Sequence, residues 1–133
     1  MTRRALREQI FRIIFRVEFN SKDEMMEQIG FSVSEIENLT PEDETYIVDK
    51  SGKILTLIED IDEEIMRVSD GWNIRRIGKA ELALLRLAIY EMKYDEDVPY
   101  KVAINEALEL AKIYCSEDAR SFINGLLAKV SVE

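Results

Sequence analysis

The stretch VPYKVAINEALELAKIYCSEDARSFINGLLAK, residues 98–129, decides the fold, because it predicts two consecutive helices. The first follows Pro99, which suits a first helical turn, where a backbone N–H would have no partner. Ser116 is a suitable N-cap for the second, and two acidic residues follow it where the helix dipole favours negative charge. We interpret Gly125, inside the second helix, as a point of close approach between helices. Apolar residues recur at helical spacing in both segments: Ala103, Ala107, Leu110 and Tyr114, then Ala119, Phe122, Ile123, Leu126, Leu127 and Val130.

The rest of the chain predicts more helices and no strand. Residues 79–94 are apolar on nearly every side, which is typical of a central helix. Arg86 and Glu91 on that helix are expected to be paired or to lie at its edge, because unpaired buried charge is unfavourable. The other predicted helices span residues 3–19, 22–29 (stopping at Gly30), 41 to about 57 (with a weak point at Ser51-Gly52) and about 61–70, with a loop at 31–40 and a connector at 72–78.

These elements predict an all-α fold of six or seven helices. No linker separates them, so we expect a single domain over residues 1–133 made of two contiguous helical subdomains. The predicted subdomains are residues 1 to about 70 and about 71 to 133.

The composition fits a soluble globular protein that works in the cytoplasm. Hydrophobic residues make up 47% of the 133 residues and charged residues 34%. A single cysteine excludes an internal disulfide framework and suits a reducing compartment. We find no signal peptide and no apolar run near the ~20 residues that span a bilayer.

The residues that most enzymes use are missing. The chain has no histidine, the commonest general base and metal ligand. Cys115 has no CxxC partner, and we interpret it as a packed structural residue. The acidic run at 59–64 lacks the spacing of a calcium loop and is typical of a solvated helix face. We therefore predict a protein that is not an enzyme and that needs no cofactor or metal.

The charge is divided unevenly along the chain. Residues 1–16 contain five arginines and one glutamate, a net charge of +4, whereas the remainder carries 13 basic and 26 acidic side chains, a net charge of −13. A small basic end on an acidic body can hold a polyanion locally while the rest repels it. RNA binding by the first helix competes with a plainer interpretation, a basic surface that offsets acidic neighbours.

Several sequence blocks resemble the NusB family of bacterial antitermination factors. The blocks occur in the family's order and spacing, which makes the resemblance more specific than one short motif. It is strong from about residue 79 onward and weak over 20–70. The blocks are Leu6-Arg7-Glu8, Glu81 with LLRLAIYE (84–91), PYKVAINEALELAK (99–112) and FINGLL (122–127).

The resemblance implies an RNA-binding transcription antitermination and elongation factor with two helical subdomains. Such proteins pair with NusE, a small-subunit ribosomal protein, and bind boxA RNA of nascent transcripts, notably from ribosomal RNA operons. This pairing helps to assemble an antitermination complex on RNA polymerase.

The resemblance also implies which residues bind. Phe15 stands where family members can carry tyrosine. Arg7 is expected to tolerate charge reversal with weaker RNA binding and little loss of folding. The residues implied in RNA binding are Arg3, Arg4, Arg7, Lys112, Asp118 and Phe122, and those implied in partner binding are Phe15, Arg76 and Glu81.

Two alternatives to this function stay open at this point. One is a protein-binding helical adaptor without an RNA role. The other is an RNA-positioning module like the NusB-like domain of RNA cytosine methyltransferases, although no catalytic domain follows in this sequence. Self-association through the partner-binding face, as some family members show, is a further expectation of the resemblance.

Overall fold

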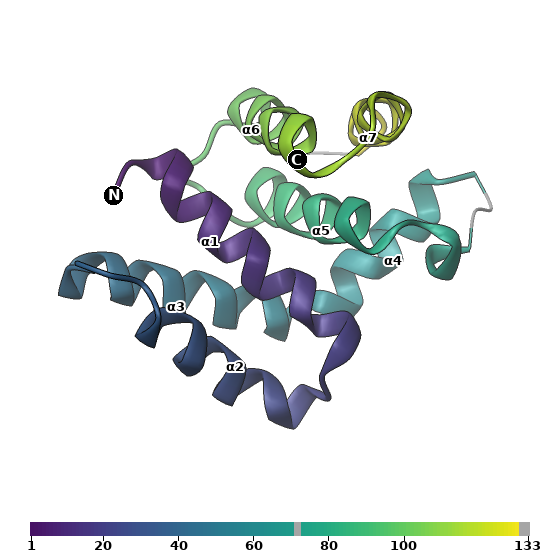
Figure 1. Ribbon diagram of the computed structural model, residues 1–133. Helices are drawn as coiled ribbons and strands as arrows, with labels where there is room; N and C mark the ends of the chain where they lie inside the picture. The colour runs from purple at the N-terminus through teal and green to yellow at the C-terminus, as the bar shows by residue number, and fades with distance from the viewer. Residues whose placement is uncertain (71–72, 131–133) are drawn as a thin grey trace. The chain divides into compact units, whose positions relative to one another are not determined.

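A computed structural model describes residues 1–70 and 73–130, and these residues form seven α-helices, two short 3-10 helices and no strand. The chain divides into two compact units, Met1–Thr56 and Leu57–Glu133. The structure therefore places the division before the helix that spans Ile58–Val68, whereas the sequence suggested a boundary near residue 70. Figure 1 shows the all-helical architecture that the composition predicted.

The first unit is built from α1 (Arg3–Phe15), α2 (Lys22–Ser34) and α3 (Pro41–Thr56). Helices α1 and α3 pack side by side, and α2 packs on α3 (Figure 1). The predicted helix over 3–19 is one α-helix followed by a 3-10 helix, η1 (Arg16–Phe19). Asn20 ends it by donating from Nδ2 to the carbonyl of Arg16 at 2.9 Å. The largest fully buried side chains of this unit are Ile10, Ile13, Ile14, Met25, Ile29, Ile47 and Ile54.

The prediction that α2 stops at Gly30 is wrong. The helix continues through Gly30 to Ser34, because the buried stripe it carries extends to Val33. That packing outweighs the roughly 1 kcal/mol that a glycine costs inside a helix. The chain turns instead at Asn38, whose φ of 58° lies in the left-handed region that asparagine tolerates.

The weak point predicted at Ser51-Gly52 does not break α3, which runs unbroken over 16 residues.

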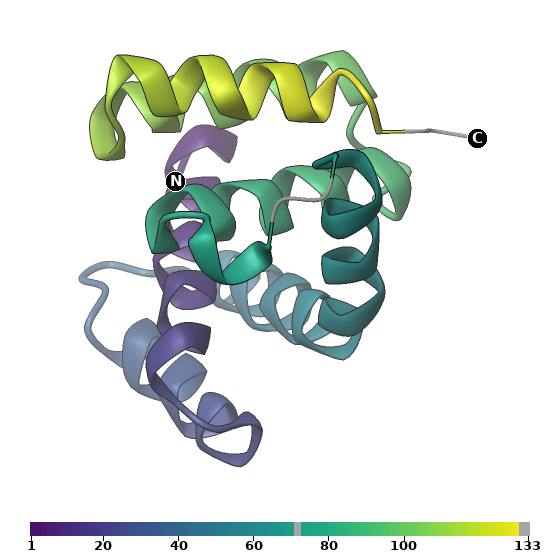
Figure 2. The same cartoon turned by 90° about the vertical axis from the view of Figure 1, so that its right-hand side faces the viewer.

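The second unit comprises α4 (Ile58–Val68), η2 (Ile74–Arg76), α5 (Lys79–Lys93), α6 (Tyr100–Tyr114) and α7 (Glu117–Leu127). Helix α5 is central, as predicted: every residue from Leu82 to Met92 is buried, and α4, α6 and α7 all pack against it. Figure 2 shows α6 and α7 lying side by side within this unit.

An ion pair between buried Arg86 and half-buried Asp62 links α4 to α5. Both Nε and Nη2 of Arg86 donate to the carboxylate of Asp62, each at 2.8 Å. The expectation that Arg86 is paired is confirmed. The expectation of close helix approach at Gly125 is wrong, since a β-carbon added there would have nothing within 4 Å apart from the adjoining backbone of its own helix.

Candidate nucleic-acid interface and partner-binding residues

The predicted basic end begins with Arg3 and Arg4, which occupy the first turn of α1 and are exposed. Thr2 caps this helix by accepting a hydrogen bond from the Ala5 N–H at 3.0 Å. The first turn contains no acidic residue. Two cations therefore lie at the positive end of the helix dipole, which is unfavourable for the helix but favourable for an approaching phosphate.

Helix α3 holds this arginine-bearing end in place. The guanidinium carbon of Arg3 lies 4.7 Å from the centre of the Tyr46 ring, a cation–π contact. The N-terminal amine of Met1 pairs with Asp43 at 2.9 Å. Two points on α3 therefore order the residues at the start of α1, which lowers the entropy lost when a ligand binds there.

Tyr46 and Lys50 are residues that the sequence interpretation missed. The Nζ of Lys50 lies 5.3 Å from the Tyr46 ring centre and donates to its hydroxyl at 3.1 Å, although Lys50 is only 5% exposed. Their i, i+4 spacing on a predicted helix was a signal that they are neighbours. The position of Tyr46 under Arg3 depends on packing between α1 and α3, which spacing does not reveal.

The expectation that Arg7 tolerates charge reversal with little loss of folding conflicts with the burial of this side chain. Arg7 is 6% exposed and belongs to the buried face of α1, beside Leu6 and Ile10. A carboxylate in its place would be buried in the core face of α1, which is costly. Arg3 and Arg4 are accordingly the arginines accessible to a ligand in this group.

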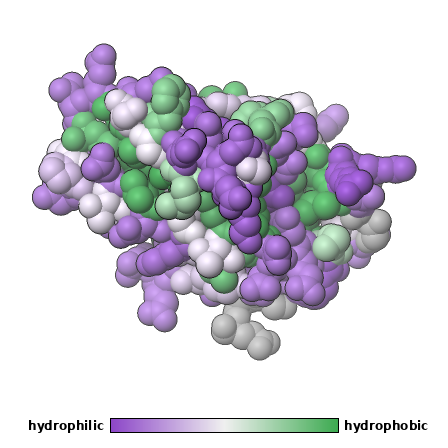
Figure 3. All heavy atoms as spheres, turned by 90° about the horizontal axis from the view of Figure 1, so that it is seen from below, coloured by the Kyte–Doolittle hydropathy of each residue, from purple (hydrophilic) through white to green (hydrophobic). Residues whose placement is uncertain are grey.

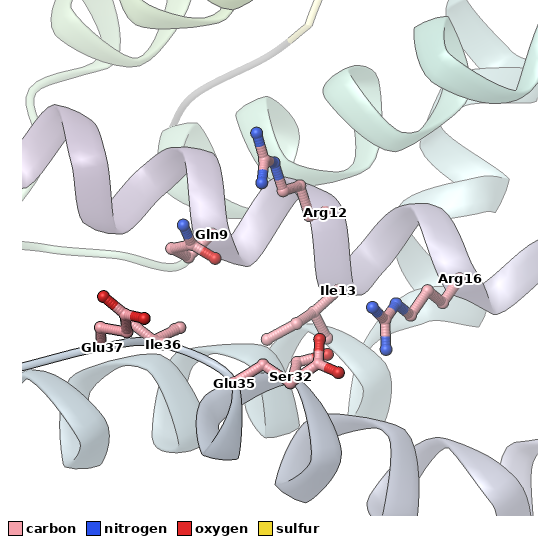
Figure 4. A pocket seen from close by; sticks show the side chains of 8 residues that line it. All are labelled: Gln9, Arg12, Ile13, Arg16, Ser32, Glu35, Ile36 and Glu37. Atoms are coloured by element: carbon pink, nitrogen blue, oxygen red, sulfur yellow. The ribbon is translucent and has the colours of Figure 1, made fainter. Parts of the chain in front are cut away.

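The remaining N-terminal arginines have a mixed electrostatic environment. Arg12 lies 3.3 Å from Glu8, and Nη1 of Arg16 donates to Gln28 at 3.0 Å. Both border a pocket of about 320 Å³ in the first unit, shown in Figure 4, with glutamates on its other side. Local acid offsets these two cations, which makes them weaker candidates for phosphate contacts than Arg3 and Arg4. The pocket is lined by Gln9, Arg12, Ile13, Arg16, Ser32, Glu35, Ile36 and Glu37.

The second unit places Asp118 and Phe122 on one face of α7, four residues apart. Ser116 caps the helix by accepting from the Ala119 N–H at 3.1 Å, as predicted. Asp118 is exposed and Phe122 half-buried, so the aromatic ring is neither a plain core residue nor a free platform. Lys112, in the last turn of α6, is exposed and pairs with Glu109 at 3.1 Å.

A shallow pocket of about 260 Å³ lies beside Phe122. At its rim, the Nζ of Lys129 contacts the carboxylate of Asp70 at 2.6 Å. Gly125 borders this open space, which agrees with the absence of neighbouring atoms around it. The pocket is lined by Val68, Ser69, Asp70, Ser121, Phe122, Gly125, Leu126 and Lys129.

The predicted partner-binding residues fall in both units. In the first, the ring of Phe15 lies between those of Phe11 (centroids 6.5 Å apart) and Phe19 (5.4 Å), and Phe19 is 60% exposed. In the second, exposed Arg76 ends η2, and half-buried Glu81 lies in the first turn of α5. The sequence interpretation missed this phenylalanine row, although Phe11, Phe15 and Phe19 recur every four residues within the predicted helix over 3–19.

The face drawn in Figure 3 presents no single continuous hydrophobic patch. The face in Figure 3 is mostly hydrophilic, and its hydrophobic side chains form separate groups. Among residues 1–70 and 73–130, no group of three or more cysteine, aspartate or glutamate side chains could hold a metal. No helix in the same ranges is both long enough and apolar enough to cross a bilayer.

Comparison with known proteins identifies the family. The NusB family model matches residues 4–132. The transcription antitermination protein NusB of Lachnoclostridium phytofermentans is 45% identical over 130 residues, which is 98% of each chain. That of Agathobacter rectalis is 44% identical and covers 97% of this chain and 98% of its own. The solved structure of T. maritima NusB superposes with a TM-score of 0.88 at 28% identity, over 97% of this chain and 89% of that one. The chain belongs to the NusB family.

Proposed function

We propose that this chain is a transcription antitermination factor that binds boxA-type RNA of nascent transcripts, notably from ribosomal RNA operons, together with the ribosomal protein NusE. Family membership supports the general role. The observation that carries RNA binding is the pair of exposed arginines at the start of α1, with Arg3 ordered on Tyr46. The protein acts by binding, through charge and aromatic contacts, and catalyses no reaction.

The charge distribution explains why a partner would be required. The accessible cations of the basic end are few, and the chain as a whole carries a net charge of −9. A few phosphate contacts give weak, salt-sensitive binding. A basic ribosomal protein that binds the same RNA adds further contacts, and each protein then raises the effective concentration of the other on the RNA. Tight and selective binding would therefore belong to the complex.

The predicted RNA residues of the second unit have a different role in this proposal. Asp118 accepts hydrogen bonds from base amino groups, and Phe122 offers an aromatic edge for an unstacked base. Lys112 supplies a cation. Such contacts distinguish sequences, whereas the arginines at the start of α1 contact phosphates and supply affinity.

The experiment is fluorescence anisotropy with boxA RNA and a scrambled RNA, with and without NusE, at several salt concentrations. Selective binding that needs both proteins and weakens with salt supports the proposal. Arg4→Glu should weaken it and lower the slope of log K against log salt by about 0.7 for each phosphate that the variant no longer binds. Arg12→Glu makes the same charge change on the same helix beside Glu8 and serves as the matched control.

Other outcomes have distinct meanings. Binding of NusE without RNA selectivity would indicate a protein-binding adaptor. RNA binding that Arg4→Glu and Arg12→Glu weaken equally would place the contact elsewhere. Binding of neither NusE nor RNA would overturn the proposed function, and a concentration-dependent dimer that excludes NusE would show self-association through the partner face.

A further inference from the structure

We propose that Gly78 and Cys115 are positioning residues, which hold the carboxylate of Glu81 where the chain presents it to its protein partner. This inference rests on the proposed function, in which Glu81 contacts NusE. It goes beyond that function because neither positioning residue needs to touch the partner. All three residues belong to the second unit: Gly78 is the N-cap of α5, Glu81 is three residues later, and Cys115 is the C-cap of α6.

Helix α2 shows the ordinary arrangement of such a glutamate. There Ser21 is the N-cap, and Glu24, also three residues later, turns back to accept a hydrogen bond from the Ser21 N–H at 2.7 Å. This capping box leaves room for the serine side chain, whose Oγ accepts from the Glu24 N–H at 3.3 Å. A glutamate at the third position and a β-carbon at the N-cap are therefore compatible.

At α5 the carboxylate occupies a different place. A β-carbon added to Gly78 would overlap Oε2 of Glu81, and it would lie 2.8 Å from Cδ and 3.4 Å from Oε1. The carboxylate thus lies directly over the glycine, in the volume that a serine would fill. Gly78 has φ −57° and ψ 149°, a conformation open to any residue. The glycine is needed for the space it leaves and not for its backbone freedom.

The thiol of Cys115 also contacts this carboxylate. Burial, the charge of Glu81 and a hydrogen bond to it together raise the pKa of Cys115 to about 12. The thiol stays protonated at neutral pH and donates to the carboxylate. The space at Gly78 admits the carboxylate and the thiol of Cys115 donates to it there, so one rotamer of Glu81 is favoured before any partner binds.

Fixing the rotamer matters because Glu81 is partly exposed and has several rotatable bonds. A glutamate free to move would lose rotamer entropy on pairing with an N–H donor of the partner. It would also accept from its own helix N-terminus, as Glu24 does in α2. The glycine and the thiol direct the carboxylate away from that competing position.

The test uses Gly78→Ser, which supplies the N-cap that Ser21 supplies in α2. Serine is at least as good an N-cap as glycine, so the variant should fold. Its side chain should displace the Glu81 carboxylate into an ordinary capping box. Gly52→Ala is the matched control, because a side chain there meets nothing within 4 Å. Glu81→Gln removes the charge with little change of shape.

Two measurements test the thiol contact and the partner contact separately. Alkylation of Cys115, the chain's single cysteine, should accelerate about threefold or more at pH 9 in Gly78→Ser and in Glu81→Gln, because a lower thiol pKa gives more thiolate. In the double variant, Gly78→Ser with Glu81→Gln, the acceleration should equal that of Glu81→Gln alone. If Gly78→Ser instead loosened the structure around Cys115 in general, the two accelerations would add. NusE binding should weaken in both single variants and stay unchanged in Gly52→Ala.

Each contrary result has one meaning. Alkylation of Gly78→Ser at the wild-type rate would overturn the positioning. The proposal would also be overturned if Gly78→Ser bound NusE normally while Glu81→Gln bound it weakly. Displacing the Glu81 carboxylate would then have no effect on partner binding. Failure of the unmodified chain to bind NusE would overturn the proposed function. That failure is distinguishable from failure of the positioning, because it is measured before any variant is made.

Discussion

The guanidinium of Arg3 lies over the ring of Tyr46, 4.7 Å from its centre, although the two residues are 43 positions apart and on different helices. This contact orders a helix end that would otherwise fray. It also gives α3 a role in presenting the arginines. Substitutions on α3 should therefore affect RNA binding as well as stability.

Replacing Tyr46 should separate the effect of the ring from that of the hydroxyl. Tyr46→Ala removes the platform under Arg3 and should weaken RNA binding by the complex with NusE about two- to fivefold, the size of an exposed cation–π contact. Tyr46→Phe keeps the ring and should bind RNA normally, with a loss of about 1 kcal/mol in unfolding free energy because Lys50 loses its hydroxyl acceptor. Anisotropy and urea unfolding measure the two effects. Equal RNA affinity of Tyr46→Ala and the unmodified chain would show that ordering Arg3 is unimportant.

Arg7→Glu should destabilise the fold rather than act only on RNA binding. The side chain is 6% exposed, so reversal buries a carboxylate in the core face of α1. We expect a loss of about 2–4 kcal/mol in urea unfolding. Arg4→Glu, one turn earlier and exposed, should cost less than about 0.5 kcal/mol. Comparable unfolding midpoints for the two variants would contradict this distinction.

The pair between Asp62 and Arg86 should be sensitive to loss of one partner. Asp62→Ala removes both hydrogen bonds that the buried guanidinium donates to this carboxylate and should lower the unfolding free energy by about 2 kcal/mol. Adding Arg86→Met to Asp62→Ala removes the buried positive charge and should recover part of the loss. Urea unfolding of the three chains tests this, and a double variant no more stable than Asp62→Ala would refute it.

Glu64 should make stability depend on pH in the acid range. A hydrogen bond from Arg67 holds the pKa of Glu64 below its ordinary value of 4.5, with a smaller contribution from the charge of Lys93. The unfolded chain therefore binds this proton at higher pH than the folded chain does. The stabilisation is complete above the unfolded pKa and is lost as the pH falls through the folded pKa. Urea unfolding between pH 3 and 7 should show a shallower pH dependence for Glu64→Gln, and identical slopes would contradict it.

Gly125→Ala should stabilise the chain. The glycine lies inside α7, no atom would lie within 4 Å of an added side chain, and its backbone needs no special conformation. Alanine at such a position gains about 0.5–1 kcal/mol. Thermal unfolding measures the gain. A lower melting temperature would show that the open space beside Phe122 is needed for folding.

The sequence alone determined the fold class and most helices of this protein. Helical periodicity and capping residues are local signals, since a helix forms its backbone hydrogen bonds within itself. The Ser21–Glu24 capping box, the start of α3 at Pro41 and the central position of α5 could all be predicted. The end of α2 could not, because burial as far as Val33 outweighed the local signal of Gly30.

Only tertiary structure decided which candidate residues are accessible and what holds them. Spacing placed Arg3, Arg4 and Arg7 together, but packing buried Arg7 and set Arg3 on Tyr46. In the same way, Gly78, Glu81 and Cys115 are separated by up to 37 positions, and only the meeting of α5 with the end of α6 brings them together. Side-chain positions depend on neighbours that are distant in the sequence, whereas the helices that carry them depend mostly on residues three or four positions away.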